Sequence, residues 1–144
     1  MQDSSNDHGR NMPKKDTKKT GRAGEYLASF LFEMSGEVEV HHVDRTDYDL
    51  ICRVSDGQLV KVQVKAASCA TTRTERHKTP TYAFYNKRDV SDVDYFCFVA
   101  LDQMRMRLVR AQDVKVKYTT MHVEDFSDEL QAADLAAFIS AFSH

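Results

Sequence analysis

The fold of this chain is most constrained by two short alternating segments, 49–54 and 60–65, which are separated by a turn. In each segment every second residue is apolar, and most of the residues between them are polar. This period of two predicts β-strands with one apolar face and one more polar face. Because Ser55-Asp56-Gly57 lies between the segments, we expect the two strands to form a hairpin.

The length of the turn decides which residues face each other across this hairpin. A two-residue loop would place Asp49 opposite Val64. A three-residue loop, with Gly57 in the left-handed conformation, would place Asp49 opposite Gln63. We prefer the second register because it keeps the valines on one face and groups Asp49, Gln63 and Lys65 on the other.

The polar face of the hairpin has the residue types of a metal site that cleaves phosphodiesters. Asp49 and Gln63 would supply two side-chain oxygen ligands for Mg²⁺, the Val64 carbonyl is a possible third, and water and a phosphate would complete the site. Such a metal polarises the phosphoryl group and lowers the pKa of a bound water. Lys65 would activate that water or stabilise the transition state. Each residue alone is also compatible with an ordinary half-exposed strand, and it is their combination that favours a site.

Glu25 is a further candidate ligand, and it comes from another part of the chain. It lies near the first turns of a predicted helix, so only the tertiary fold can bring it to Asp49. We expect it to reach the metal directly or through a water; the alternative is a favourable charge near the helix N-terminus. His41 and His42 are adjacent on a predicted strand and point to opposite faces, so we interpret them as surface residues.

The other periodic segments predict an α/β domain in which a mixed sheet is flanked by an N-terminal and a C-terminal helix. The first helix is expected from Thr17 or Thr20 to about Met34. Its predicted apolar stripe consists of Tyr26, Leu27, Phe30, Leu31 and Met34. Further elements are expected as strands at 38–43, 81–85, 95–100 and 104–110, and as a helix after Ser127. Residues 66–81 are typical of a long irregular loop.

Length and composition indicate one folded domain. The 144 residues suffice for a hydrophobic core, and no apolar run approaches the ~20 residues that cross a membrane. The three cysteines show no metal-binding spacing, which favours reduced thiols and a cytoplasmic protein. We expect residues 1–16 to be a disordered basic arm and residues 17–144 to form the single domain.

The charge is unevenly distributed, although the net charge is only −2. Residues 1–22 and 61–88 are basic, whereas residues 119–144 contain five acidic residues and no lysine or arginine. This polarity favours a surface that binds a nucleic-acid backbone, although charged faces can also segregate without function. The candidate DNA contacts are Lys14, Lys15, Lys18, Lys19, Arg22, Lys61, Ser68, Arg73, Arg76, His77, Lys78, Lys87 and Arg88.

The order of these motifs resembles the PD-(D/E)XK nuclease superfamily, and most closely the group I intron-associated endonucleases and archaeal Holliday-junction resolvases. The resemblance rests on Gly24-Glu25, Tyr48-Asp49 and Val62-Gln63-Val64-Lys65, with supporting strands at 93–100 and 104–114, and covers roughly residues 18–116. Tyr48 replaces the usual proline. Gln63 replaces the usual acidic residue, as it does in some active intron-associated members.

This resemblance implies a restriction-endonuclease-like core and an enzyme that hydrolyses DNA with Mg²⁺, for which Mn²⁺ can substitute. The implied catalytic residues are Glu25, Asp49, Gln63 and Lys65. The resemblance also implies a homodimer or higher homo-oligomer. Two alternatives stay open: a Holliday-junction resolvase acting on branched DNA, and an inactive nucleic-acid-binding module of the same fold.

Overall fold

The computed structural model describes residues 17–43, 48–54, 57–72, 79–85, 92–114 and 118–142. Its elements, in chain order, are α2 (Thr17–Met34), β1 (Val38–His42), β2 (Leu50–Val54), β3 (Leu59–Ala67), β4 (Thr81–Tyr85), β5 (Tyr95–Ala100), β6 (Arg105–Arg110), η2 (Ala111–Asp113), β7 (Tyr118–His122), η3 (Val123–Asp125) and α3 (Asp128–Ala141). The predicted arm, residues 1–16, lies outside the described residues. Among the described elements, no helix is both long and apolar enough to span a bilayer.

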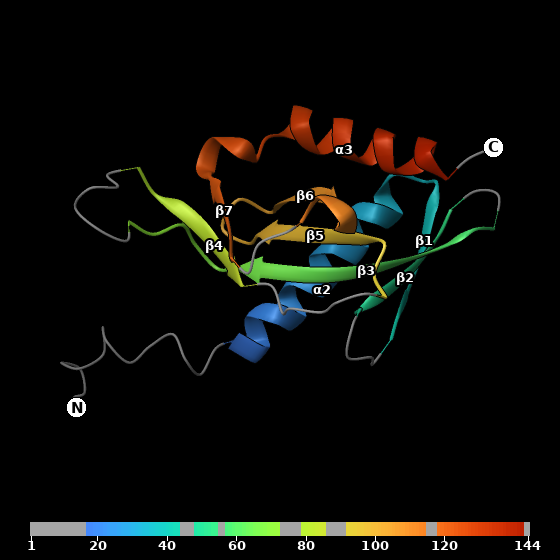
Figure 1. The fold of residues 1–144 in the computed structure, drawn as a ribbon, viewed down its shortest axis with the longest axis horizontal. Helices are drawn as coiled ribbons and strands as arrows, with labels where there is room; N and C mark the ends of the chain where they lie inside the picture. Colours follow the sequence, from blue (N-terminus) through green and yellow to red (C-terminus); the bar gives the residue numbers. More distant parts are fainter. Residues whose placement is uncertain are drawn as a thin grey trace.

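The main sheet has five strands in the order β1-β2-β3-β5-β6. Only the central pair, β3 and β5, is parallel, and the other neighbours are antiparallel, so the sheet is mixed as the sequence predicts. A separate two-stranded sheet pairs β4 with β7. Figure 1 shows this pair at one end of the molecule (left) and β1 and β2 at the other (right).

The β2–β3 hairpin has the predicted three-residue register. The ladder pairs Leu50 with Val62 and Cys52 with Val60. The turn is closed by two hydrogen bonds, from the Gly57 N–H to the Val54 carbonyl at 2.8 Å and from the Val54 N–H to the Gln58 carbonyl at 3.0 Å. Gly57 has a φ of +89°, the left-handed conformation that this loop requires and that glycine adopts without steric cost.

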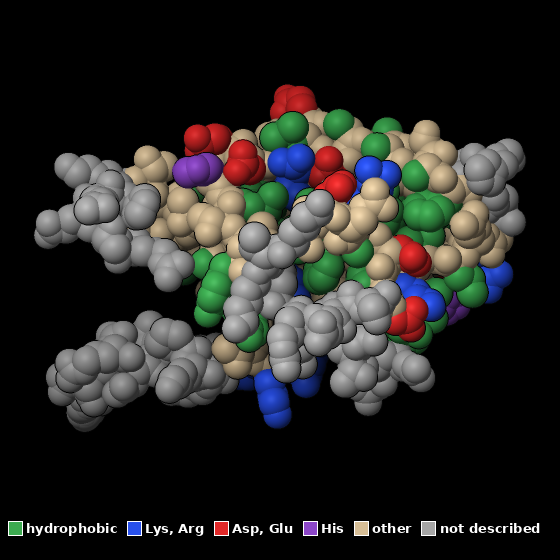
Figure 2. All heavy atoms as spheres, viewed as in Figure 1, with side chains coloured by type: hydrophobic (Ala, Val, Ile, Leu, Met, Phe, Trp, Pro, Cys, Tyr) green, Lys and Arg blue, Asp and Glu red, His purple; other side chains and the backbone are tan. Residues whose placement is uncertain are grey.

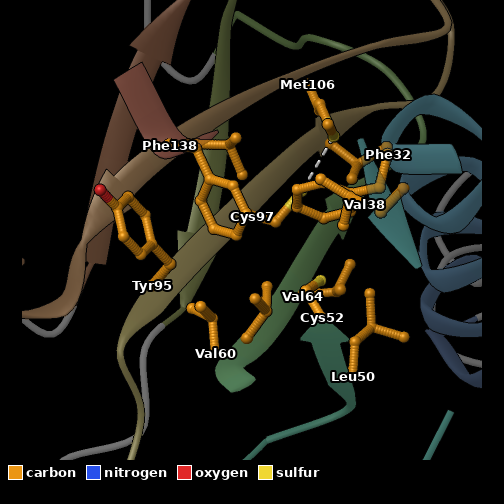
Figure 3. Packing of buried hydrophobic residues seen from close by; sticks show 14 of the residues in the cluster. Phe32, Val38, Leu50, Cys52, Val60, Val64, Tyr95, Cys97, Met106 and Phe138 are labelled. Atoms are coloured by element: carbon orange, nitrogen blue, oxygen red, sulfur yellow. Dashed lines mark hydrogen bonds between the residues drawn. The ribbon is translucent and has the colours of Figure 1, made fainter. Parts of the chain in front are cut away.

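Two hydrophobic clusters cover the two faces of the main sheet. On one face both helices pack on the sheet, and the ring centroids of Phe32 and Phe138 lie 5.1 Å apart. Figure 3 shows these two rings among the buried residues of this cluster. On the other face the small β4–β7 sheet packs through aromatic residues, with Phe84 lying 4.9 Å from Phe98 between ring centroids. Alternate residues of β5 therefore belong to different clusters, which explains why all six of its residues are buried.

The packed side of α2 differs from the predicted stripe. Leu27 is buried as expected, and Leu31 is partly buried, but Tyr26, Phe30 and Met34 are exposed. The prediction favoured large side chains, whereas the approach of the helix to the sheet is set by small ones. At Gly24 an added Cβ would lie 2.5 Å from the Cβ of Ala66, so the helix backbone almost touches β3 there.

Three strand predictions also need correction. β3 continues to Ala67, so the first two residues of the predicted loop 66–81 belong to the sheet. β6 begins at Arg105 rather than Met104, because Met104 ends a turn with a φ of +57°. Strand β7, Tyr118–His122, was not predicted, because its threonines and its exposed tyrosine give no apolar alternation.

Helix side chains complete the hydrogen bonds of both outer strands. Glu33 of α2 accepts the Val40 N–H of β1 at 2.9 Å. On β6, Gln131 of α3 accepts the Met106 N–H at 2.9 Å. One helical turn later, the Asp134 carboxylate accepts the Leu108 N–H at 2.8 Å. Both edges are thereby protected against pairing with a further strand.

Candidate active site

The candidate site lies at the first residue of β2, Leu50, where β3 continues beyond its pairing with β2. β2 pairs with β3 only through Leu59–Val62, whereas β5 pairs with β3 from Val62 to Ala67. Over its last residues β3 therefore has a strand partner on the β5 side only, in the part of the chain that the structure describes. The peptide groups of Val64 face the open side, because the Val62 carbonyl, two residues earlier, bonds towards β2. We call this open side of β3 the notch.

Asp49 closes the start of the notch and is held by three hydrogen bonds. Its N–H donates to the Val62 carbonyl at 2.9 Å, and its carbonyl accepts the Val43 N–H at 3.0 Å. Its side-chain Oδ2 accepts the Val64 N–H at 2.8 Å. Asp49 thus bonds to Val62 and Val64, the residues on both sides of Gln63, and these bonds fix it against this part of β3.

The Asp49 carboxyl is in an unfavourable setting for a negative charge. Burial raises its pKa, and this effect outweighs the opposing influence of the Val64 N–H and of the positive charges of Lys65 and His42. Lys65 is therefore near enough to Asp49 to act on its charge, as the predicted shared face requires. His41 and His42 are exposed, which confirms their interpretation as surface residues, and His42 also lies near enough to Asp49 to lower its pKa.

Glu25 reaches the same neighbourhood from α2. It follows Gly24, where the backbone of the helix packs closely against the side chains of Val64 and Ala66. Burial raises the pKa of Glu25, the charge of Asp49 raises it further, and Arg22 opposes both effects. The two carboxylates therefore repel each other, and a cation bound between them would relieve that repulsion.

Gln63 carries an unusual polar atom. The residue is only 8% exposed. Its Oε1 is shielded from solvent and has no hydrogen-bond partner among the described residues. A buried acceptor without a partner costs about 1–3 kcal/mol, so native proteins rarely retain one without a reason. An oxygen ligand for a metal is such a reason.

These donors fit a hard divalent cation. Carboxylate, amide and backbone carbonyl oxygens are the ligands that Mg²⁺ and Mn²⁺ accept in proteins. Among the described residues no group of three His, Cys, Asp or Glu side chains could hold a metal. A site in the notch would therefore depend on Asp49, with Glu25 and the neutral oxygens of Gln63 and Val64 completing the set.

The predicted DNA contacts divide into three groups. Lys18, Lys19 and Arg22 are exposed on the first turns of α2, and Ser68 is exposed just beyond the end of β3. Figure 2 shows Lys and Arg side chains at the lower edge, where α2 begins, and acidic ones on the side of α3. Lys61 instead forms an ion pair with Asp92, whose carboxylate oxygen lies 2.7 Å from its Nζ. The other candidates lie outside the described residues: Lys14, Lys15, Arg73, Arg76, His77, Lys78, Lys87 and Arg88.

Comparison with known proteins shows the family and the fold of this chain. The sequence model of the PD-(D/E)XK endonuclease family matches residues 15–138. The chain belongs to this family. Among solved structures, a bacterial homing endonuclease, I-Ssp6803I, superimposes with a TM-score of 0.65 at 20% identity, covering 87% of this chain and 92% of the other. That likeness shows the shared fold. A search of curated proteins finds no match.

Proposed function

We propose that this nuclease hydrolyses phosphodiester bonds in DNA with Mg²⁺ as its cofactor, which Mn²⁺ can replace. The observation that carries the proposal is the buried Gln63 Oε1, which has no hydrogen-bond partner in the described structure. The Asp49 carboxylate accepts the N–H of the next residue, Val64, and it repels the carboxylate of Glu25. A buried glutamine oxygen with a purely structural role would normally have a partner.

The ion would be held by Asp49, by Gln63 through its amide oxygen, and by the Val64 carbonyl, with Glu25 binding directly or through water. When bound, it supplies Lewis-acid polarisation of the phosphoryl group and lowers the pKa of a water. Lys65 follows Gln63 by two residues, on the same face of β3, so its ammonium can donate a hydrogen bond to a phosphate oxygen or to the attacking water.

DNA would approach the notch along the start of α2. Lys18 and Arg22 precede Glu25 by seven and three residues, so they lie on the same flank of the helix and lead towards the notch. Their charges can neutralise phosphates next to the scissile bond. The described cysteines are free thiols, which fits the cytoplasmic location expected from the sequence.

The test is nicking of supercoiled DNA by the Lys65→Ala variant with and without Mg²⁺. We expect the rate to fall on the order of 10²–10³-fold, because a fixed charge beside the transition state is lost. Folding and DNA binding should persist. Arg53→Ala is the matched control: it removes a cation from the other end of the same hairpin, where it pairs with Glu39 at 3.4 Å, and it should cleave at the wild-type rate.

Two results would contradict the proposal. Wild-type rates in Lys65→Ala would remove the lysine from the chemistry. Binding of DNA without any divalent-dependent cleavage would favour a non-catalytic module. A four-way junction offered beside linear duplex tests the resolvase alternative, since a resolvase cleaves the junction selectively.

A further inference from the structure

The small β4–β7 sheet presents two tyrosine rings to solvent. Tyr85 ends β4 and Tyr118 begins β7, and the register of the ladder places them opposite each other. Their ring centroids lie 5.1 Å apart, and the ring planes are tilted by 60°. In such a tilted contact the edge of one ring approaches the face of the other, so much of the ring surface stays open. The two residues are accordingly 49% and 56% exposed.

The packing of this sheet does not require aromatic residues on its outer face. Its inner face already has an aromatic core, because Tyr82 and Phe84 are buried there and contact neighbouring rings. On the outer face, the pair of opposed residues next to the tyrosines is Ala83 and Thr120, which are small and exposed. Tyrosine is enriched in binding surfaces, because its ring is apolar and its hydroxyl is polar. The exposed pair therefore favours a binding role.

The tyrosine pair lies over the same face of the main sheet as the catalytic candidate Lys65. Lys65 pairs with Phe98 in the β3–β5 ladder, and residues that are paired in this way project to the same face. The ring of Phe98 lies 4.9 Å from that of Phe84, and Tyr85 is the next residue in the chain. Figure 1 shows the end of β4 and the start of β7 beside the arrowhead of β3, which β4 contacts. DNA bound at the notch can therefore extend to the two rings.

The charges near the pair in the sequence favour a nucleic acid. Lys117 directly precedes Tyr118, and Lys87 and Arg88 follow Tyr85 by two and three residues. These three cations lie outside the described residues, so the site itself consists of the two tyrosines. Because the cations are bonded into the chain within three residues of the rings, their charge attracts a polyanion to them.

Unpaired bases fit this site better than other occupants do. Every base has a flat face that stacks on an aromatic ring, whatever the sequence. In an uninterrupted duplex these faces are covered by the neighbouring base pairs, so surface rings reach them only where bases are unpaired. A protein partner fits less well, because two rings beside an alanine and a threonine offer far less than the about 800 Å² per partner of a standard interface.

We propose that Tyr85 and Tyr118 bind an unpaired base of the DNA substrate by stacking. This nuclease then prefers DNA with a single-stranded stretch beside the cleaved phosphodiester over an uninterrupted duplex. The inference rests on the proposed function, because it concerns the form of the DNA that the notch would cleave. It adds a binding site that is separate from the proposed metal ligands.

The first test compares the affinity for two DNAs, a full duplex and the same duplex with a short single-stranded gap. Fluorescence anisotropy measures binding in the presence of a chelator, so that no cleavage interferes. We expect the wild type to bind the gapped DNA more tightly. Tyr85→Leu and Tyr118→Leu should each weaken binding to the gapped DNA roughly 5- to 150-fold, as loss of one stacking ring does. Both variants should bind the full duplex like the wild type.

Three features of these variants separate stacking from a role in stability. Leucine keeps an apolar contact across the ladder, and Tyr118→Phe keeps the ring, so Tyr118→Phe should bind both DNAs like the wild type. Phe30→Leu is the matched control, because it removes a 57% exposed ring from α2 and leaves the small sheet intact. It should also bind like the wild type. Equal affinity of the wild type for both DNAs, or equal weakening for both DNAs in the leucine variants, overturns the proposal.

The second test uses the wild-type protein, so it does not depend on the folding of a variant. A 5-iodouracil in the gap is irradiated in the complex, because this base cross-links to an aromatic ring on which it stacks. Peptide mapping should place the cross-link on Tyr85 or Tyr118, and cross-links confined to other residues would overturn the site. Both tests are made without divalent ions. A failure to cleave DNA would contradict the proposed function and would leave the outcome of these tests unchanged.

Discussion

At the β6 edge, an aspartate and a glutamine of α3 both accept hydrogen bonds from the sheet, whereas of the aspartate and the glutamine at the notch of β3 only the aspartate does so. Asp134 accepts the Leu108 N–H at 2.8 Å and forms an ion pair with Arg107 at 2.7 Å. Gln131 accepts the Met106 N–H at 2.9 Å. Both side chains therefore accept hydrogen bonds at this edge of the sheet.

The notch contains the corresponding pair, Asp49 and Gln63. Asp49 accepts a strand N–H at 2.8 Å, just as the aspartate of α3 does. Its pKa is nevertheless raised, because burial outweighs the help from Val64 and Lys65. Within the described structure the Gln63 Oε1 has no partner at all. The two glutamines thus differ in whether their side-chain oxygen has a hydrogen-bond partner, and, among the described residues, the two aspartates differ in whether a cation is paired with the carboxylate at close range.

This difference separates a structural pair from a functional one. Satisfied acceptors stabilise the protein, so their loss should affect folding. Acceptors kept without partners cost stability, and proteins retain them where a ligand later uses them. The comparison therefore predicts opposite effects for the same substitutions in the two places.

The largest expected difference is between Asp49→Asn and Asp134→Asn. Asp49→Asn should reduce Mg²⁺-dependent cleavage on the order of 10²-fold or more, because a charged ligand is lost. Its unfolding free energy without metal should not fall at neutral pH, since asparagine can still accept the Val64 N–H and carries no disfavoured charge. Asp134→Asn should keep cleavage and lose about 2 kcal/mol of unfolding free energy, because Arg107 loses its charged partner and keeps only the Asp125 carbonyl.

Single-turnover cleavage and urea unfolding measure the two quantities for each variant. Loss of stability in Asp49→Asn together with normal cleavage would contradict the comparison, because Asp49 would then be structural like its counterpart on α3.

Much of the site is predictable because it is local. Asp49, Gln63 and Lys65 lie on one hairpin, and a period of two together with one left-handed glycine determines their common face. Glu25 lies on a separate helix. Its approach depends on Gly24, whose lack of a side chain allows close packing on β3. The spacing of apolar residues along the sequence does not predict such a contact.

The parts of the fold that could not be predicted are set by tertiary contacts. The sequence of α2 has apolar residues on more than one side, and hydrophobic period alone does not reveal which side meets the sheet. Its exposed row, Tyr26, Phe30 and Met34, was therefore assigned to the core. Strand β7 becomes a strand by pairing with β4, which lies far away in the sequence. His42 comes near Asp49 only because β1 pairs with β2.

A smaller effect is expected for the glutamines. Gln63→Met should raise the unfolding free energy of the metal-free protein by about 1 kcal/mol, because a buried acceptor without a partner is removed. Gln131→Met should lower it by about 1–3 kcal/mol, because the Met106 N–H then has no acceptor. Urea unfolding in the presence of a chelator compares the two. A similar loss in both variants would show that Gln63 has a structural partner after all.

The smallest effect is a pH dependence of the metal-free protein. The pKa values of Glu25 and Asp49 are raised by folding, so their contribution to stability is fully present below their usual values, 4.5 and 3.8, and is lost as the pH rises through the raised values.

Glu25→Gln removes one of these titrations. The stability difference, variant minus wild type, should therefore increase with pH across this window, by less than about 1 kcal/mol because Glu25 is partly screened by solvent. Taking this difference cancels the carboxyls that do not interact with Glu25, including Asp128, whose pKa is lowered by Arg105. Thermal unfolding from pH 3.5 to 7 measures this stability difference. Saturating Mg²⁺ should reverse the sign of the difference, because the wild type then gains more from binding.

A difference that decreases with pH in the absence of metal would mean that Arg22 stabilises the Glu25 anion more than burial and Asp49 oppose it, and Glu25 would then resemble the satisfied carboxylate of α3.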